Sequence, residues 1–159
     1  MNPNIFEPEL DEDFDRDGFR HRGEETGKRA GTERLGASLY ELEPGQANCP
    51  YHWHAAEEEL LLVLSGTVAV RTPEGTREAG AGEVVAFRRG AGGAHQLIAS
   101  GDEPARFLML SERRSPDICV YPDSNKIGAR NRVEDASGIR FNFRAGDAVD
   151  YFDGEEAPR

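Results

Sequence analysis

Short hydrophobic segments of four to nine residues begin after Thr32 and alternate with turns that are rich in glycine and proline. No segment between them has the 3.6-residue hydrophobic period of an amphipathic helix, which argues against a parallel sheet with crossover helices. Regularly spaced short strands of this kind predict an all-β sandwich or barrel. The expected strands are Arg34–Leu42, Tyr51–Ala55, Glu59–Leu64, Thr67–Thr72, Thr76–Ala79, Val84–Phe87, His95–Ala99 and Ala105–Ser111.

Several of these strands are hydrophobic on both faces. In residues 60–64, Leu60, Leu62 and Leu64 point opposite to Leu61 and Val63, so both faces of this strand need cover. A second copy of the chain packed on an outer sheet face would cover it, and we therefore predict a homodimer that buries on the order of 1,600 Å². The alternative is that the chain's own N-terminal arm or C-terminal segment covers these leucines.

The pattern divides the chain into three parts. Residues 1–31 are polar and acidic and show no sustained period, which predicts an extended or partly disordered arm. Residues 32–115 form the barrel. Residues 116–159 form a C-terminal extension in which residues 139–144 alternate like a strand. Because Tyr151 and Phe152 lie inside its acidic tail, we expect the extension to pack on the barrel or on a partner subunit.

The net charge of −11 is concentrated at the two ends of the chain. Residues 1–25 hold nine acidic residues against three arginines, and residues 147–159 hold five against one. An acidic chain without a basic stripe argues against nucleic acid and anionic membrane surfaces as partners. No apolar run reaches the roughly 20 residues of a membrane span, and two cysteines, Cys49 and Cys119, are too few for a disulfide scaffold. These features predict a soluble cytoplasmic protein.

Histidines carry the clearest chemical signal. His52 and His54 are two residues apart, so on a strand both imidazoles point to one face. Glu59 begins the next strand, and His95 follows a glycine-rich loop. Three imidazoles and one carboxylate that converge in a barrel make a site for a divalent transition metal such as Fe, Mn, Zn or Ni. His21 lies in the polar arm without such neighbours and is left out of this site.

The spacing of these residues resembles the first cupin motif, G-x5-H-x-H-x3–4-E-x6-G, and a second glycine-rich stretch is similar to the second motif, G-x5-P-x-G-x2-H-x3-N. The resemblance covers about Leu35 to Leu110, and its wider pattern is similar to small single-domain cupins. It implies a double-stranded β-helix, the jelly-roll barrel of cupins. It also implies that the metal ligands are His52, His54, Glu59 and His95.

Glu59 is preferred over its two acidic neighbours because six residues separate it from Gly66, as the motif requires, and it leads directly into the hydrophobic strand. Glu57 and Glu58 are expected to be solvated turn residues.

The sequence departs from the cupin motifs at several points. Six residues rather than five separate Gly45 from His52, and Arg88 stands in place of the motif's proline. Ala99 stands in place of the asparagine, which removes one polar supporting contact. Two further glycines lengthen the loop before His95. Of the four ligands, His95 is therefore the one whose position depends most on this loop.

Four protein ligands in an octahedral field leave two positions for water, a bidentate substrate, or a substrate with dioxygen. The pocket is expected to be small and lined by apolar side chains such as Leu61, Val63, Phe107 and Met109. Arg88 or Arg106 would bind a carboxylate at its mouth, or both are ordinary surface arginines.

Three functions fit this site. The first is a metalloenzyme of the oxygenase, decarboxylase or isomerase type that acts on a small polar or anionic metabolite. The second is a non-catalytic module that binds a metal or a metabolite, and the third is a structural dimer with a vestigial site. The complete ligand set favours the first two, although no separate general base is evident.

Overall fold

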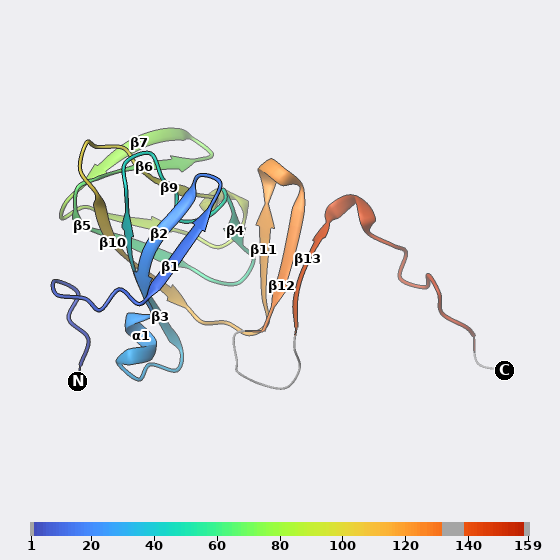
Figure 1. Cartoon of the computed structure of the whole chain (residues 1–159). Coiled ribbons are helices and arrows are strands. Elements are labelled where there is room, and N and C mark those ends of the chain that lie inside the picture. Colours follow the sequence, from blue (N-terminus) through green and yellow to red (C-terminus); the bar gives the residue numbers. More distant parts are fainter. Residues whose placement is uncertain (1, 132–138, 158–159) are drawn as a thin grey trace.

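The computed structural model describes residues 2–131 and 139–157, whose strands form three antiparallel sheets (Figure 1). The six-stranded sheet has the order β1 (Glu12–Arg16), β2 (Phe19–Glu24), β3 (Leu35–Leu42), β10 (Ala105–Glu112), β5 (Glu59–Ser65), β8 (Val84–Phe87). The three-stranded sheet has the order β7 (Gly75–Gly80), β6 (Thr67–Thr72), β9 (Gln96–Ala99). The four-stranded sheet has the order β13 (Arg140–Arg144), β12 (Lys126–Arg130), β11 (Asp117–Tyr121), β4 (Trp53–His54). The helical elements are α1 (Thr26–Arg29), η1 (Ala91–Gly93), η2 (Pro122–Ser124) and η3 (Ala145–Asp147).

Each of the eight segments predicted between Thr32 and Ser115 overlaps a strand, which confirms the all-β double-stranded β-helix. The helical elements of the described residues are three or four residues long. None of the helices in residues 2–131 and 139–157 could cross a bilayer.

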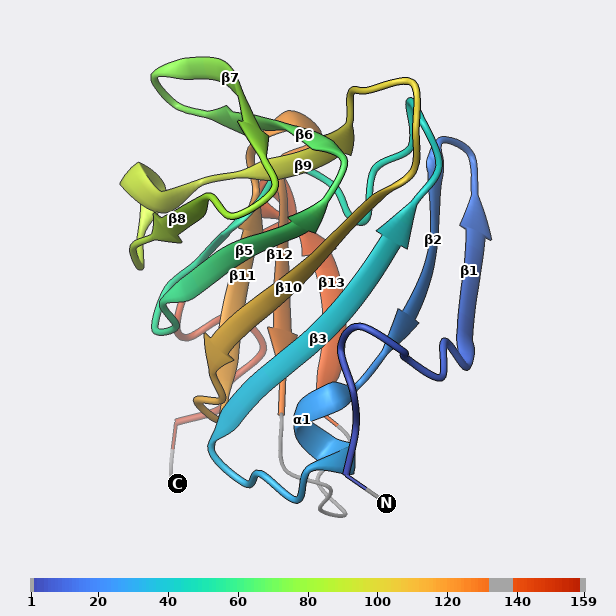
Figure 2. The same ribbon diagram turned by 90° about the vertical axis from the view of Figure 1, so that its left-hand side faces the viewer.

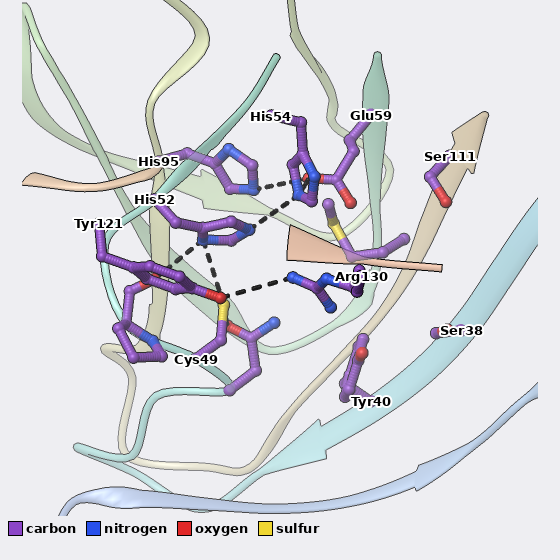
Figure 3. A pocket seen from close by; sticks show the side chains of 13 residues that line it. Ser38, Tyr40, Cys49, His52, His54, Glu59, His95, Ser111, Tyr121 and Arg130 are labelled. Carbon is purple, nitrogen blue, oxygen red and sulfur yellow. Dashed lines mark hydrogen bonds and ion pairs between the residues drawn. The ribbon is translucent and has the colours of Figure 1, made fainter. Parts of the chain in front are cut away.

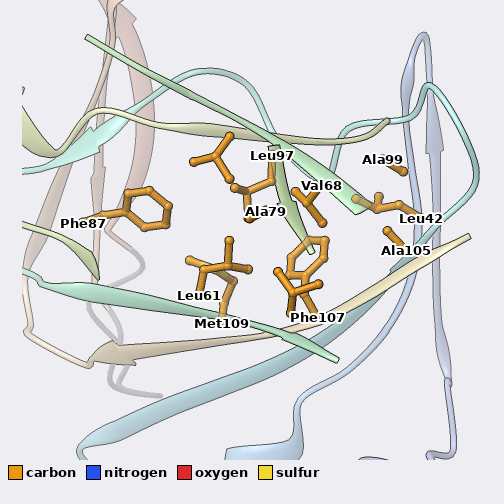
Figure 4. Close-up of a cluster of buried hydrophobic side chains, with 12 residues drawn as sticks. Leu42, Leu61, Val68, Ala79, Phe87, Leu97, Ala99, Ala105, Phe107 and Met109 are labelled. Atoms are coloured by element: carbon orange, nitrogen blue, oxygen red, sulfur yellow. The ribbon is translucent and has the colours of Figure 1, made fainter. Parts of the chain in front are cut away.

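The hydrophobic core lies between the six-stranded and three-stranded sheets (Figure 4). Leu61 and Val63 of β5 and Phe107 and Met109 of β10 alternate toward it, as the two-residue period predicts. Full burial of each such side chain stabilises the fold by about 1.5–3 kcal/mol. The facing sheet contributes Val68, Val70, Ala79, Leu97 and Ala99.

Residues 12–24 differ from the irregular arm that the sequence predicted, because they form a hairpin that extends the six-stranded sheet. Asp17 and Gly18 both have positive φ, 33° and 82°, as a two-residue hairpin turn requires. β1 is exposed along its whole length, so it lacks the apolar alternation that reveals a strand in a sequence. The Asp-Gly pair was the available signal for this hairpin.

The C-terminal extension contacts the barrel through β11, which pairs with β4 and places Cys119 opposite His54. β12, which follows it, lies in a stretch for which the sequence predicted no strand. The tail after β13 extends away from the barrel (Figure 1). Tyr151 and Phe152 are 86% and 71% exposed. These two side chains therefore do not pack on the barrel, which was one of the two places expected for them. Packing on a partner subunit stays a prediction.

The outer face of the six-stranded sheet carries a row of cross-strand hydrophobic neighbours, Leu39, Leu108, Leu62 and Val84. The N-terminal segment passes beside β3 on this side (Figure 2), and Arg106 Nη1 donates to the carbonyl of Phe6 at 3.4 Å. Leu39 and Leu108 are accordingly buried, whereas Leu62 is half-buried and Val84 is 54% exposed. The chain's own N-terminal residues therefore cover the β3 side of this face but leave the β8 side open.

We expect the purified chain to sediment as a homodimer at micromolar concentration, twice its mass of 17.5 kDa. Val84→Asp should raise the dimer dissociation constant at least about tenfold, because it would bury an unpaired charge in the interface. Val149→Asp, on the exposed tail, is the matched control. A monomeric wild-type chain in sedimentation velocity would contradict the dimer, and a monomeric Val149→Asp variant would move the interface to the tail.

Candidate metal site

Four side chains from three segments of the chain converge on one cavity of the barrel (Figure 3). His54 lies on β4, Glu59 begins β5, and His52 and His95 face each other across an isolated β-bridge. In this bridge the His52 N–H donates to the His95 carbonyl at 3.1 Å, and the His95 N–H donates back at 2.8 Å. The structure therefore brings together the four residues that the sequence singled out.

The donor atoms of His52, Glu59 and His95 all lie within 4.8 Å of one another, and His54 lies next to two of them. His52 Nε2 lies 3.1 Å from His54 Nε2, and the Nε2 atoms of His54 and His95 lie 3.3 and 3.2 Å from Glu59 Oε2. Two bonds of about 2.1 Å to one metal place donor atoms about 3.0 Å apart at a right angle and about 3.4 Å apart at a tetrahedral angle. The observed separations fall between these values.

The outer nitrogen of each ring meets an oxygen. His52 Nδ1 lies 2.9 Å from the carbonyl of Pro50, His95 Nδ1 lies 3.0 Å from that of Gly93, and His54 Nδ1 lies 3.0 Å from Asp117 Oδ2. These oxygens accept hydrogen bonds only, so each Nδ1 carries a proton, and a ring that is neutral has its lone pair at Nε2. Glu59 Oε2 is buried and lies between the Nε2 atoms of His54 and His95. Neutral rings in this arrangement turn their lone pairs toward one another and toward Glu59, and a proton or a metal ion between them relieves the repulsion.

Electrostatics also favour a cation at this cluster. Burial and the neighbouring His95 lower the pKa of His52 to about 4. Burial likewise opposes the charge on His54, but hydrogen bonds with Asp117, Cys119 and Glu59 outweigh burial and raise the pKa of His54 to about 12. Burial acts to raise the pKa of Glu59, yet His54 and His95 hold it below its usual range. The positive charge is thus stabilised between two carboxylates.

The lengthened glycine loop does not displace His95 from the cluster. Residues 91–93 take up the extra length in the short helix η1, and a Cβ atom at Gly93 would overlap the carbonyl oxygen of Arg88. The His95 ring stacks on Phe87 with 3.8 Å between ring centroids and an angle of 11°. This stacking holds the ring with Nε2 toward Glu59.

Two acidic residues beside His54 were not recognised from the sequence. Glu57 was expected in solvent, but it is 1% exposed, accepts a hydrogen bond from the Arg114 N–H at 2.9 Å, and lies 3.7 Å from His54 Nδ1. Glu58 is exposed as expected. Asp117 is fully buried and received no role in the sequence analysis. A buried acidic residue looks solvated in a sequence because its partner lies far along the chain.

Other donor groups occur near His54: one combines it with Glu57 and Asp117, another with His52 and Cys119. Glu57, Asp117 and Cys119 do not line the cavity, whereas Glu59 and all three clustered histidines do. The cluster that faces the cavity is therefore the better candidate. His21 lies outside it and stacks on Phe14, in keeping with its exclusion.

The cavity has a volume of about 220 Å³ and is more polar than expected. Leu61, Val63 and Phe107 belong to the dry core, and of the predicted lining residues only Met109 borders the cavity. The full lining is Ser38, Tyr40, Asn48, Cys49, Pro50, His52, His54, Glu59, His95, Met109, Ser111, Tyr121 and Arg130.

The arginine at this cavity is not one of the two suggested by the sequence. Arg88 is exposed, and Arg106 pairs with Glu41 at 2.6 Å on the outer sheet face. Both are surface residues, and Arg130 of β12 lines the cavity instead.

Comparison with known proteins agrees with the fold. A family model described as the cupin domain matches residues 38–111. A protein from Acidithiobacillus ferrooxidans, provisionally named a sugar phosphate isomerase, is 27% identical to this chain. The match covers 83% of this chain and 81% of that protein, with a TM-score of 0.74. A sugar phosphate isomerase of the cupin superfamily from Silicibacter pomeroyi is 22% identical over 84% and 82% of the two chains, with a TM-score of 0.73.

A polyketide cyclase from Streptomyces resistomycificus is 22% identical over 73% of each chain, with a TM-score of 0.52. The last two likenesses are below 25% identity and bear on the fold alone. No protein of curated function matches the chain. The motif residues, the double-stranded β-helix and the matching domain model lead to one conclusion: residues 38–111 of this chain form a cupin domain.

Proposed function

We propose that this protein is a metalloenzyme that acts on a small polar or anionic metabolite. One divalent transition metal, Fe, Mn, Zn or Ni, is held by His52, His54, Glu59 and His95. The observation that carries the proposal is the convergence of three Nε2 atoms whose rings are each held at Nδ1 by an oxygen. That arrangement of inner ligands and outer acceptors is typical of histidine metal sites.

The chain's own residues define what such a site can do. The bound metal would supply a Lewis acid that polarises a substrate oxygen, or a redox centre if it is Fe or Mn. Glu59 offsets part of the metal's charge, and Asp117 orients His54. Burial raises the pKa of Tyr40 above its usual range and that of Tyr121 to about 12, so both hydroxyls stay protonated and donate to oxygens of a ligand.

Isomerisation is the reaction type that similarity favours. The Acidithiobacillus protein, which is provisionally named a sugar phosphate isomerase, matches about four-fifths of both chains at 27% identity. A cavity of about 220 Å³ is smaller than the pockets that hold drug-sized ligands, so it suits a small metabolite. Oxygenase and decarboxylase chemistry use the same kind of centre and are separated from isomerisation by assay.

A non-catalytic metal-binding or metabolite-binding cupin is the second candidate. Among the residues that line the cavity, the only imidazoles and carboxylate are the four proposed ligands. A reaction that needs a separate general base therefore lacks one in the described cavity. Turnover is what separates the two candidates.

Replacing both His52 and His54 by alanine should reduce the metal content from about one ion per chain to background in elemental analysis of untagged protein, because two donors are lost. Metal at about 100 times its Kd should raise the wild-type melting temperature by roughly 5–10 °C and leave that of the variant unchanged. His21→Ala, outside the cavity, is the control and should keep its metal. Full stoichiometry in the double variant would refute the site.

Asp117→Asn should weaken metal affinity about 10–100-fold while all four ligands remain, because His54 loses the carboxylate that orients its ring. Competition with a fluorescent chelator measures this change. Asp102→Asn, at an exposed turn, is the control and should bind as the wild type does. Equal affinity in the two variants would show that Asp117 does not support the metal site.

Metal-loaded protein should interconvert aldose and ketose phosphates in an NMR assay, and the double histidine variant should show no turnover. Oxygen consumption or release of carbon dioxide with a hydroxy acid would instead assign the oxygenase or decarboxylase type. Full metal loading with no turnover in any of these assays would favour the non-catalytic candidate.

A further inference from the structure

Arg130 is the one arginine among the thirteen residues that line the cavity, and no lysine is among them (Figure 3). It comes from β12, in the C-terminal extension, beyond residues 38–111 that match the cupin domain model. Its side chain is 33% exposed, so part of a permanently charged guanidinium is removed from water. Such burial is costly unless the group has partners, and those partners indicate what the residue can bind.

The contacts of Arg130 leave part of its donor capacity unused. Nη2 lies 2.9 Å from Cys119 Sγ and 3.4 Å from the Tyr121 hydroxyl, and Nε lies 3.7 Å from Asp117 Oδ2. That carboxylate oxygen is also 3.0 Å from His54 Nδ1, so it serves two cations. A guanidinium has five N–H donors. Nη1 meets no acceptor among the residues that the structure describes.

The guanidinium is close to the proposed metal ligands. Cys119 Sγ, which touches Arg130 Nη2, is 3.7 Å from His54 Nε2, so one sulfur atom separates the guanidinium from the cluster. Tyr121 is stacked on His52 with ring centroids 5.9 Å apart and an angle of 26°. A small molecule in this cavity can therefore reach both the metal ligands and Arg130.

The charges around the cavity select an anion. Glu59 is the only carboxylate among its lining residues, and Arg130 is the only guanidinium. With a divalent metal in place the lining carries two net positive charges, and the neighbouring carboxylate of Asp117, 3.7 Å from Arg130 Nε, offsets one of them, so the balance still favours an anion. A planar guanidinium also binds two phosphate oxygens at once, and the neutral donors Ser38, Tyr40 and Ser111 line the same space.

We propose that Arg130, together with the Tyr121 hydroxyl, forms an anion subsite that binds the phosphate group of a phosphorylated metabolite. This inference rests on the proposed function for the role of the metal, but the subsite itself consists of residues outside the ligand set. The C-terminal extension thereby determines which substrates the cupin barrel accepts.

Calorimetric titration with inorganic phosphate tests the subsite. Wild-type protein should bind phosphate, and Arg130→Gln should bind it about 10–100-fold more weakly, because a charge-assisted hydrogen bond is lost. Arg130→Lys, which keeps the charge but not the two-pronged geometry, should lie between them. Arg88→Gln removes an exposed arginine as the matched control and should bind as the wild type does.

The metal content and the circular dichroism spectrum of each variant show whether it still binds metal and is still folded. Arg130→Gln should retain the wild-type metal content, and Tyr121→Phe, which removes one hydroxyl, provides a milder loss of phosphate affinity. Equal phosphate affinity in the wild type and Arg130→Gln, or no phosphate binding by the wild type, would overturn the subsite. Tighter binding of acetate than of phosphate would overturn its assignment to phosphate.

The same titration separates this inference from the proposed function. Chelator-treated protein should still bind phosphate through Arg130, although more weakly. A chain that takes up no metal but binds phosphate in an Arg130-dependent manner would refute the metalloenzyme and leave the anion subsite standing.

Discussion

Three imidazole rings and one carboxylate share the interior of this barrel, and the cost of burying them depends on what each ring nitrogen meets. An unpaired buried polar group costs about 1–3 kcal/mol. Pro50, Gly93 and Asp117 each supply an oxygen to one Nδ1 atom. The inner nitrogens then face one another and Glu59, an arrangement that a cation stabilises. The oxygens come from the glycine loop before His95, from β11, and from the turn before β4. Each of these segments therefore supplies the acceptor that one buried ring needs.

The polar site and the hydrophobic core share strands, so a single strand borders the core at one end and the cavity at the other. On the inner face of β3 the side chains change from Leu42 through Tyr40 to Ser38. On β10, which pairs with β3 in an antiparallel direction, the side chains change in the same way from Phe107 through Met109 to Ser111. Because the strands pair in register, their polar ends meet and border the cavity, while their apolar ends close the core. One face of one sheet thus stabilises the fold and lines the site.

The site depends on more of the chain than the cupin domain. Residues 38–111 contain all four proposed ligands, but Asp117 and Arg130, which lie beside them, come from β11 and β12. Asp117 bonds to His54, and Arg130 contributes the cavity's guanidinium. One fold can accept different substrates if its common barrel holds the metal ligands and a variable extension provides the charged side chains that bind the substrate.

Local patterns in the sequence predicted the barrel strands and the pair of His52 and His54, and the resemblance to the cupin motifs implied Glu59 and His95 as further ligands. Alternation places Leu61 and Val63 on one face, and a two-residue spacing places His52 and His54 on another. The roles of Glu57, Asp117 and Arg130 could not be predicted in this way. Glu57 bonds to a backbone N–H 57 residues away and Asp117 to a ring 63 residues away. A charged residue is exposed or buried according to its partner, and folding brings that partner from a distant part of the chain.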